Sequence, residues 1–485
     1  MQIAGLLVLR RNTIFNINIP VKIKKGQSLE VQISDIAYGG KGLVRVNGLT
    51  VFVDQAVPGD QVLIRFTRKR RKYAEARVVN LLKASPNRID PLCTYSGFCG
   101  GCKWQFLDYA IQLKYKRQHV RESLEHIGLI KSVPVHPSIP SPLTYGYRNK
   151  MEFTCTRRRW LTPTQMQQPG IEKEVGIGLH VPGTFFKVFD TKRCLLQPDL
   201  GNHILDDVRQ VIKTSALPVY GLRSHQGFWR FLMLRHSVAL DCWMVNIVTA
   251  YDHGQALQPM VDLLVQKYPQ VIAVINNINA RKAGVTTGEV ERTLAGDDMI
   301  LDKIGSFTFE ISANSFFQTN TAGADKLYDT VRRYADLSGS ESVVDLYSGT
   351  GTIPILLSEG AAEIIGLEMA PSAVADAERN CRNNQIDNCR FVAGDIRETL
   401  PAIARRPEVL IIDPPRAGMH KDVVKQTLAL RPDRIVYVSC NPSTLARDLG
   451  LLKEAYRVLE VQPVDLFPHT YHIESVARLV SRKTR

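Results

Sequence analysis

The sequence predicts an α/β protein whose C-terminal part is a doubly wound, largely parallel sheet, preceded by a small β-barrel and a central α+β domain. Three observations lead to this prediction. At 485 residues the chain is too long for one hydrophobic core. From Ser342 onwards the sequence repeats a strand, loop and helix pattern, which is typical of parallel sheets. Residues 28–82 instead alternate short β-prone runs with glycine-containing turns, as small barrels do.

The net charge of +15 is unevenly distributed along the chain. Residues 1–90 contain 16 Lys and Arg against 6 Asp and Glu, so +10 of the charge lies in the first fifth of the sequence. This excess favours a polyanionic ligand, either nucleic acid or an acidic membrane surface. No run reaches the ~18 apolar residues of a membrane span. Apolar residues 3–9 precede Arg10 and Arg11 instead of following basic residues, unlike a signal peptide, so we expect a cytoplasmic protein without a membrane partner.

The predicted barrel covers residues 24–84. Five β-prone runs, separated by turns at Gly39-Gly40, Asn47-Gly48 and Pro58-Gly59, predict its strands. The basic run 68–72 falls in the loop before the last strand, and it is either a solvated loop or a contact to a phosphate backbone. This stretch resembles a TRAM domain, a small OB-like RNA-binding barrel, and the resemblance implies that the ligand is RNA.

Three cysteines follow the barrel within residues 85–104, namely Cys93, Cys99 and Cys102. The glycine pair at 100–101 permits a tight turn, so nearby thiolates can face one centre. A fourth ligand is needed, for which Cys194 is the best candidate and Cys155 the weaker alternative. Close cysteine spacing in a reducing compartment favours a metal site over a disulfide, and four thiolates suit either zinc or a [4Fe–4S] cluster. Chance clustering in a glycine-rich loop is the alternative.

Residues 105–316 predict a central α+β substrate domain. Helical periodicity covers 107–127, and β-like runs occur at 151–156, 176–180, 231–235 and 244–249. Several aromatic side chains could stack on RNA bases, although burial in the core is the simpler interpretation of each. They are Trp104, Trp160, Phe185, Phe186 and Trp229.

Residues 317–485 carry the predicted parallel sheet. The loop after its first strand offers only Gly349 and Gly351, so the dinucleotide motif GxGxxG is absent. Asp345 with these two glycines suits a cofactor that has an amino-acid end. Glu368, at the tip of the second strand, could accept hydrogen bonds from a ribose, and Asp395 after the third could bind an adenine amino group. S-adenosylmethionine on a Rossmann-like sheet has these requirements, and another small-molecule α/β enzyme is the alternative.

Cys440 follows the β-prone run 435–439 and precedes Asn441-Pro442, where a helix can begin. It is either a buried inert thiol or a nucleophile. With a methyl donor nearby, addition of a thiolate to C6 of a pyrimidine makes C5 nucleophilic, and a base must then remove the C5 proton. We predict that Glu474 is this base, with His469 and His472 as alternatives.

Six motifs, in this order along residues 24–485, resemble the RNA 5-methyluridine methyltransferase family, specifically its iron–sulfur, TRAM-containing branch that modifies 23S rRNA. They are the four cysteines and the segments FFQTN (316–320), DLYSGTG (345–351), DPPRAG (413–418), SCNP (439–442) and HTYHIE (469–474). The resemblance implies Cys440 as nucleophile and Glu474 as base. It also implies a [4Fe–4S] cluster on Cys93, Cys99, Cys102 and Cys194, and S-adenosylmethionine contacts from Gln318, Tyr347, Glu368, Asp395 and Asp413. Thr352 and Tyr471 depart from some members, which have Asn and Gly there.

The sequence therefore predicts S-adenosylmethionine-dependent C5 methylation of a uridine in 23S rRNA, with RNA as partner and no protein partner evident. Methylation of a tRNA uridine by the same chemistry is the first alternative. A radical enzyme with a TRAM domain is disfavoured, because its cysteine motif is CxxxCxxC and the first gap here is five residues. An RNA-binding assembly factor with a silent catalytic domain is disfavoured by the intact Cys440, Glu474 and Asp413.

Overall fold

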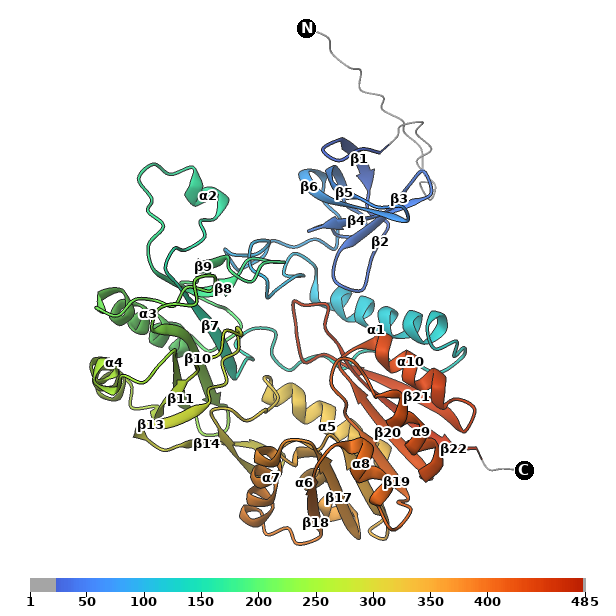
Figure 1. Cartoon of the computed structure of the whole chain (residues 1–485). Coiled ribbons are helices and arrows are strands. Elements are labelled where there is room, and N and C mark those ends of the chain that lie inside the picture. Colours follow the sequence, from blue (N-terminus) through green and yellow to red (C-terminus); the bar gives the residue numbers. More distant parts are fainter. Residues whose placement is uncertain (1–22, 483–485) are drawn as a thin grey trace. The chain divides into compact units, whose positions relative to one another are not determined.

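A computed structural model describes residues 23–482, and its internal contacts divide the chain into two compact units. The smaller unit contains the described residues up to 92 together with 103–111, and the larger unit contains 93–102 and the residues from 112 onwards. Figure 1 labels most of the helices and strands of both units. The apolar run 3–9 lies outside the described residues. Within residues 23–482, no helix has the length and apolar character needed to cross a membrane.

The smaller unit is built on one six-stranded sheet with the order β1-β5-β6-β4-β3-β2. β4 and β6 pair in parallel, and the other neighbours are antiparallel. Alternate residues of the strands are buried, so one face of the sheet encloses a core that is rich in valine, isoleucine and alanine. The strands are β1 Ser28–Gln32, β2 Asp35–Ile36, β3 Gly42–Val46, β4 Leu49–Asp54, β5 Gln61–Lys69 and β6 Tyr73–Lys83.

The structure corrects two details of the predicted barrel. It has a sixth strand, β2, whose two residues are too few to show a periodic pattern. The prediction that residues 68–72 form a loop is wrong for the first two residues, because Arg68 and Lys69 end strand β5. The tight turn that follows is closed by the Arg70 N–H, which donates to the Tyr73 carbonyl at 2.8 Å. The end of β5 is exposed on both faces, and such a strand has no apolar alternation to reveal it.

The larger unit contains a seven-stranded central sheet with the order β13-β12-β11-β10-β7-β8-β9. Helices α3 and α4 contribute leucine, isoleucine and valine side chains to the core of this sheet. Four of the strands lie at the predicted β-like runs, whereas β9, β12 and β13 had no sequence prediction. The strands are β7 Lys150–Thr156, β8 Gly176–His180, β9 Val188–Asp190, β10 Trp229–Ser237, β11 Cys242–Thr249, β12 Val271–Ile278 and β13 Val290–Gly296, and the helices are α2 Pro163–Met166, α3 Asp199–Thr214 and α4 Gly254–Lys267.

A second seven-stranded sheet, in the order β18-β17-β16-β19-β20-β22-β21, forms the C-terminal part of the larger unit. The five strands from β18 to β20 are parallel, and β22 is antiparallel to both of its neighbours. The chain passes from β16 to β17 on one side and returns to β19 on the other, which creates the crevice where open α/β sheets bind ligands. The strands are β16 Ser342–Leu346, β17 Glu363–Glu368, β18 Cys389–Ala393, β19 Val409–Ile412, β20 Arg434–Ser439, β21 Tyr456–Val464 and β22 Glu474–Ser481.

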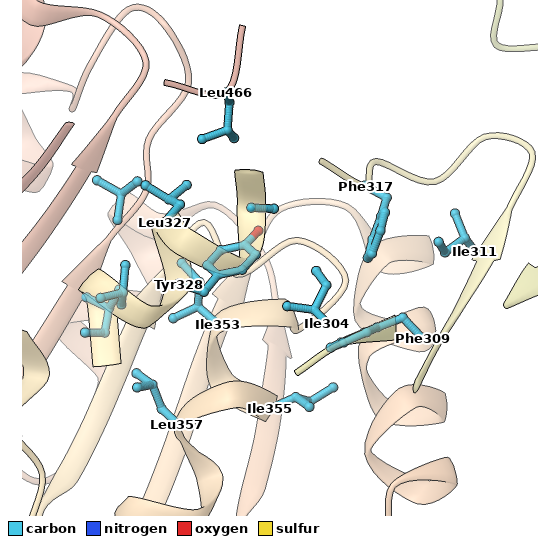
Figure 2. Packing of buried hydrophobic residues seen from close by; sticks show 14 of the residues in the cluster. Ile304, Phe309, Ile311, Phe317, Leu327, Tyr328, Ile353, Ile355, Leu357 and Leu466 are labelled. Atoms are coloured by element: carbon cyan, nitrogen blue, oxygen red, sulfur yellow. The ribbon is translucent and has the colours of Figure 1, made fainter. Parts of the chain in front are cut away.

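Helices and one hairpin cover this second sheet. The hairpin of β14 (Met299–Ile304) and β15 (Phe307–Ser312) packs with helix α5 and helix α6 in one hydrophobic cluster, in which Tyr328 lies among aliphatic side chains (Figure 2). The predicted α/β class, with an N-terminal β domain and a central α+β domain, is confirmed, and the predicted domain limits remain predictions. The helices are α1 Tyr109–His126, α5 Thr321–Ala335, α6 Thr352–Leu357, α7 Pro371–Asn383, α8 Ile396–Thr399, α9 Lys421–Leu430 and α10 Pro442–Leu452, with short 3₁₀ turns at Ser358–Gly360 and Leu400–Ala402.

Candidate active site

One cavity of about 1160 Å³ opens at the carboxyl ends of the parallel strands in the second sheet. All seven residues predicted from the sequence to contact cofactor or substrate line this cavity. They are Gln318, Tyr347, Glu368, Asp395, Asp413, Cys440 and Glu474. Five of them end one of the parallel strands β16 to β20 or lie within two residues after its end, so the topology itself brings them to one edge.

Cys440 and Glu474 come from neighbouring antiparallel strands. β20 ends at Ser439, which is paired with Ser475 of β22. Cys440 is therefore the next residue after β20, beside the first residue of β22, which is Glu474. Asn441 caps helix α10 by accepting the Ser443 N–H at 3.0 Å, and this cap ends the strand directly after the thiol. The hydrogen-bonded ladder thus fixes the thiol and the carboxylate on one wall of the cavity.

Burial perturbs the acids of this wall. It raises the pKa of Glu474 to about 8, an effect that Asp413 reinforces and the Arg416 guanidinium opposes. Burial also raises the pKa of the Cys440 thiol to about 11, with Glu474 adding to the rise and Arg416 again opposing it. Asp413 is itself buried, which raises its pKa to about 6. Asp413 thus opposes ionisation of both Glu474 and Cys440, and Glu474 opposes that of Cys440, which favours the protonated forms of the thiol and of Glu474 near pH 7.

Arg416 is the cation that compensates this group of acids, and no role for it was predicted from the sequence. Its side chain hydrogen-bonds to the Cys440 thiol and lowers the pKa values of both Cys440 and Glu474. Its backbone carbonyl accepts hydrogen bonds from Asn441 Nδ2 at 3.1 Å and from Thr444 Oγ1 at 3.3 Å. The start of helix α10 thereby positions the arginine. Its position in the DPPRAG segment is the sequence feature that could have identified it as a residue of the site.

The glycine loop after β16 has a backbone that most residues avoid. Tyr347, Gly349 and Gly351 all have positive φ angles, of 67°, 53° and 80°. A Cβ atom on Gly351 would lie 2.9 Å from side-chain atoms of Ala377 and Phe391, so glycine is required there for space as well as conformation. A non-glycine residue such as Tyr347 in this region stores strain that is common at ligand sites.

Two carboxylates near this loop are already hydrogen-bonded. Glu368 accepts the backbone N–H groups of Gly349 at 3.0 Å and Ala370 at 2.9 Å. Asp395 caps helix α8 by accepting the Arg397 N–H at 2.9 Å, and it also pairs with the Arg397 guanidinium. These bonds to Arg397 lower the pKa of Asp395 to about 2. Both carboxylates are therefore held in place by backbone N–H groups where they line the cavity.

Gln318 is held from two sides. Its carbonyl accepts Asn149 Nδ2 at 2.8 Å, and its side chain hydrogen-bonds to the Tyr328 hydroxyl. Tyr328 lies on the buried face of α5, packed between Leu327, Ile353 and Ile304 (Figure 2). Burial raises the pKa of this phenol further above its usual range, so it remains a neutral hydrogen-bonding group. Tyr328 was not predicted as part of the site, because a tyrosine within an amphipathic helix looks like an ordinary core residue.

The loop before β22 is anchored by helix α1. Lys116 is completely buried, and its ammonium group lies 2.6 Å from Asp465 Oδ1 and 3.0 Å from the Phe467 carbonyl. Of the two histidines considered as alternative bases, only His472 lines the cavity, whereas His469 stacks on Tyr145 with 4.4 Å between ring centroids. Burial lowers the pKa of each histidine to about 4, so both are neutral near pH 7.

Comparison with known proteins places this geometry in a family. Residues 252–482 match the family described as tRNA (Uracil-5-)-methyltransferase, and residues 22–79 match the TRAM domain. RNA methyltransferases from Chlorobaculum tepidum and Bacteroides thetaiotaomicron, both described as uncharacterized, are 39% and 40% identical to this chain. The alignments cover 94% and 92% of it and 97% and 100% of the relatives. The chain belongs to the tRNA (uracil-5-)-methyltransferase family.

A solved structure extends this finding to the arrangement of the chain. The tRNA (uracil-54, C5)-methyltransferase of Pyrococcus abyssi, in complex with S-adenosyl-L-homocysteine, is 28% identical with a TM-score of 0.73. The match covers 93% of this chain and 100% of that one. This protein is accordingly an S-adenosylmethionine-dependent RNA methyltransferase with a TRAM domain.

The polar groups under the glycine loop fit S-adenosylmethionine. Both carboxylate oxygens of Asp345 and the hydroxyl of Ser348 are buried without a hydrogen-bond partner among the described residues. Burial raises the pKa of Asp345 well above its usual range, reinforced by Asp413 and Glu368. A cationic cofactor would supply the missing partner charge and favour the ionised carboxylate. An amino-acid end with an ammonium group meets this need.

The four cysteines expected to bind a cluster lie in the same unit. The pKa of Cys99 is raised to about 11 by burial and by the charges of Cys194 and Cys93, whereas burial alone raises the pKa of Cys155, to about 12. Cys194 is thus the cysteine that shares an environment with the earlier ones. Within residues 23–482, however, no group of three or more His, Cys, Asp or Glu side chains is arranged to hold a metal ion. The structure does not support the expected [4Fe–4S] cluster.

Proposed function

We propose that this protein transfers a methyl group to C5 of a uridine in 23S rRNA through a covalent bond between Cys440 and C6 of the base. The observation that carries the proposal is the shared cavity of a thiol, a carboxylate and a guanidinium at the carboxyl edge of the sheet. Methylation of an amine or a hydroxyl needs no cysteine nucleophile, so the pair favours a carbon that must first be activated.

The residues of the cavity would act in sequence. Cys440 Sγ gives up its proton to water and adds to C6 as the thiolate, and the π electron pair of the C5–C6 bond moves to C5, with charge delocalised onto the O4 carbonyl. Arg416, hydrogen-bonded to the thiol, stabilises the thiolate form. S-adenosylmethionine supplies an electrophilic methyl group. The Glu474 carboxylate then removes the C5 proton, and the C6–S bond breaks to release the thiolate.

The pKa of Glu474 suits the role of base. A general base works best when its pKa lies near the operating pH, and burial brings that of Glu474 to about 8. The target base must leave its stack to reach the cavity, which is the usual requirement for chemistry on a base in structured RNA. We infer that Gln318, Tyr347, Glu368, Asp395 and Asp413 contact the cofactor, since all of them line the same cavity.

Two variants test the mechanism. Cys440→Ala should lose methyl transfer to an rRNA transcript while it still binds that RNA, and 5-methyluridine formation by this variant would overturn the proposal. Glu474→Gln should complete methyl transfer but not release the product. Denaturing electrophoresis should therefore show an RNA-linked band that Cys440→Ala abolishes.

A tRNA uridine is the second candidate substrate, because the similar Pyrococcus abyssi enzyme is described as acting on uracil 54 of tRNA. Competition between tRNA and 23S rRNA transcripts for methyl incorporation separates the two. Mapping of 5-methyluridine in both RNA classes, from cells that lack this protein, identifies the missing modification. Loss of the modification from tRNA alone would contradict the rRNA proposal.

We also propose that Cys93, Cys99, Cys102 and Cys194 carry a [4Fe–4S] cluster, on the basis of the donor chemistry and the motif resemblance. No catalytic step depends on it. Anaerobically purified protein should contain about four iron and four acid-labile sulfide per chain. Cys155→Ser should keep this content and Cys194→Ser should lose it. Wild-type protein without iron and sulfide would contradict the assignment.

A further inference from the structure

The central sheet of the larger unit carries a cluster of aromatic rings and cations that the catalytic cavity does not use. We call it the aromatic–basic patch, and it consists of Trp160, Phe185, Phe186, Lys173, Lys187 and Arg223. None of these residues lines the catalytic cavity. Trp160 and Lys173 lie in the segment between β7 and β8 that contains α2 (Figure 1). Residues 185–187 precede β9, and Arg223 lies between α3 and β10.

Ring contacts connect all members of the patch. Lys187 Nζ lies 4.0 Å from the centroid of Trp160 and 5.9 Å from that of Phe186. The guanidinium of Arg223 lies 3.6 Å from the centroid of Phe186, and Lys173 Nζ lies 5.8 Å from that of Trp160. Phe185 meets Phe186 edge to face, with 5.3 Å between their centroids. The result is one continuous surface on which rings and cations alternate.

Backbone hydrogen bonds hold this surface in place. The Trp160 N–H donates to the Val188 carbonyl at 2.6 Å, so the tryptophan runs beside the segment that bears Lys187. The Val181 N–H donates to the Lys187 carbonyl at 2.9 Å, and Gly183 provides the turn between them with a φ angle of 70°. Residues 185–187 are therefore presented by a closed hairpin, with the Trp160 backbone bonded beside it.

Exposure distinguishes these aromatic residues from the others that were considered for base stacking. Trp104 and Trp229 are buried, with exposed fractions of 0% and 1%. Phe185 is 67% exposed and Trp160 38% exposed. Large apolar rings left in water mark an interaction site more often than chance exposure, particularly where they are grouped. Phe185 and Trp160 can therefore offer a ring face or edge to a ligand, whereas Trp104 and Trp229 cannot.

The cations of the patch are available to an anionic ligand. Among the ion pairs of the described residues, none includes Lys173, Lys187 or Arg223, whereas Glu174 of the same loop pairs with Lys213 at 2.9 Å. A cation held over a ring is oriented but keeps its charge. The patch therefore combines stacking surfaces with three cations that take part in no ion pair within the part of the chain that the structure describes.

We propose that the aromatic–basic patch binds unpaired nucleotides of the RNA substrate outside the catalytic cavity. Proteins that bind single-stranded RNA combine these two features, because bases stack on aromatic rings while lysine and arginine meet the phosphates. Phe185 stacks on a base, and Lys187, Lys173 and Arg223 contact the adjoining backbone. The inference rests on the proposed function in that RNA is the substrate, and it adds a second binding surface for that substrate.

Fluorescence anisotropy with the full-length protein tests the proposal. The probe is a labelled single-stranded RNA of about 16 nucleotides, with a blunt RNA duplex of the same length as comparison. Phe185→Ala should weaken binding of the single strand about 5- to 10-fold, which is the lower range for the loss of one stacked base. The same substitution should weaken binding of the duplex far less. Lys187→Gln with Arg223→Gln should reduce the slope of log K against log salt by about 0.7 for each phosphate that the variant no longer binds.

A matched control distinguishes the patch from general positive charge. Arg333 also lies over a ring, 5.4 Å from the centroid of Tyr334, but that tyrosine is buried and cannot stack on a base. Arg333→Gln should bind the single strand like wild type, and Phe185→Tyr should retain the affinity that Phe185→Ala loses. If all patch variants bind RNA with the affinity and salt slope of wild type, the proposal is overturned. A protein would then be the better candidate ligand for the patch.

The outcome is independent of the catalytic proposal. If wild-type protein forms no 5-methyluridine but the patch variants lose single-strand affinity, the proposed chemistry fails and the binding site stands. If wild-type protein methylates RNA and the patch variants bind normally, the chemistry stands and the patch proposal fails.

Discussion

Glu474→Gln tests the electrostatics of the cavity without any substrate. Burial raises the pKa of Glu474 from 4.5 to about 8. A carboxyl whose pKa is raised on folding stabilises the folded state fully at low pH, and this stability is lost as the pH rises toward the folded-state pKa. Between about pH 6 and about pH 9, stability falls only up to the folded-state pKa of about 8 and is constant above it. The fall therefore extends over about two pH units. At about 1.4 kcal/mol per unit, this amounts to about 3 kcal/mol.

Glutamine does not titrate, so the variant should not show this loss. The other acids of the cavity interfere little, since the pKa of Asp413 is about 6 and that of Cys440 about 11. Urea unfolding, followed by tryptophan fluorescence at the two pH values, measures the difference. Glu454→Gln, at an exposed position, is the matched control and should follow wild type.

The expected result is that wild type loses about 3 kcal/mol more than Glu474→Gln between the two pH values. An equal pH dependence of the two proteins would refute the reasoning, because the carboxyl would then not be buried among other acids. A pH dependence shared by Glu454→Gln but absent from Glu474→Gln would support it.

The cavity and the groups that support it lead to three further predictions. The rate at which the covalent adduct releases methylated RNA in a single turnover should rise with pH through about 8, because the base that removes the C5 proton must be ionised, and a limb near 11 would assign control to the thiol instead. Lys116→Met should destabilise the protein by about 3–5 kcal/mol in denaturant unfolding, since it removes the ammonium group that pairs with the buried Asp465 carboxylate, whereas Lys114→Met on the exposed face of α1 should not. Gly351→Ala should lower cofactor affinity and thermal stability more than Gly339→Ala. Both glycines have positive φ angles, but only a Cβ atom at position 351 meets neighbouring atoms. Equal effects of the two substitutions would show that this crowding is irrelevant.

The strand-end residues of the site could be predicted from the sequence. Tyr347, Glu368, Asp395, Asp413 and Cys440 each occur directly at or after the end of a β-prone run, and parallel strands bring such ends to one edge. No three-dimensional information is needed for that step beyond the alternation of strands and helices.

Other parts of the site depend on contacts between distant segments. Lys116 and Asp465 are 349 positions apart, and nothing in the local sequence of either predicts that they pair. Tyr328 lies inside an amphipathic helix whose pattern reports only its buried face. The arrangement of the cysteines likewise depends on side-chain directions that their spacing does not determine. Spacing alone therefore could not establish that the four thiols face one metal centre.

The ladder between β20 and β22 makes the distance between nucleophile and base an all-or-none property. Side chains alternate across a strand, so a shift of β22 by one position would turn Glu474 to the opposite face of the sheet, and a shift by two would move it along the strand past Cys440. Insertions in the loop before β22 could be absorbed as long as the pairing of Ser439 with Ser475 persisted. Engineered changes to substrate choice are therefore best placed in that loop, whereas the pairing of β20 with β22 must keep its register.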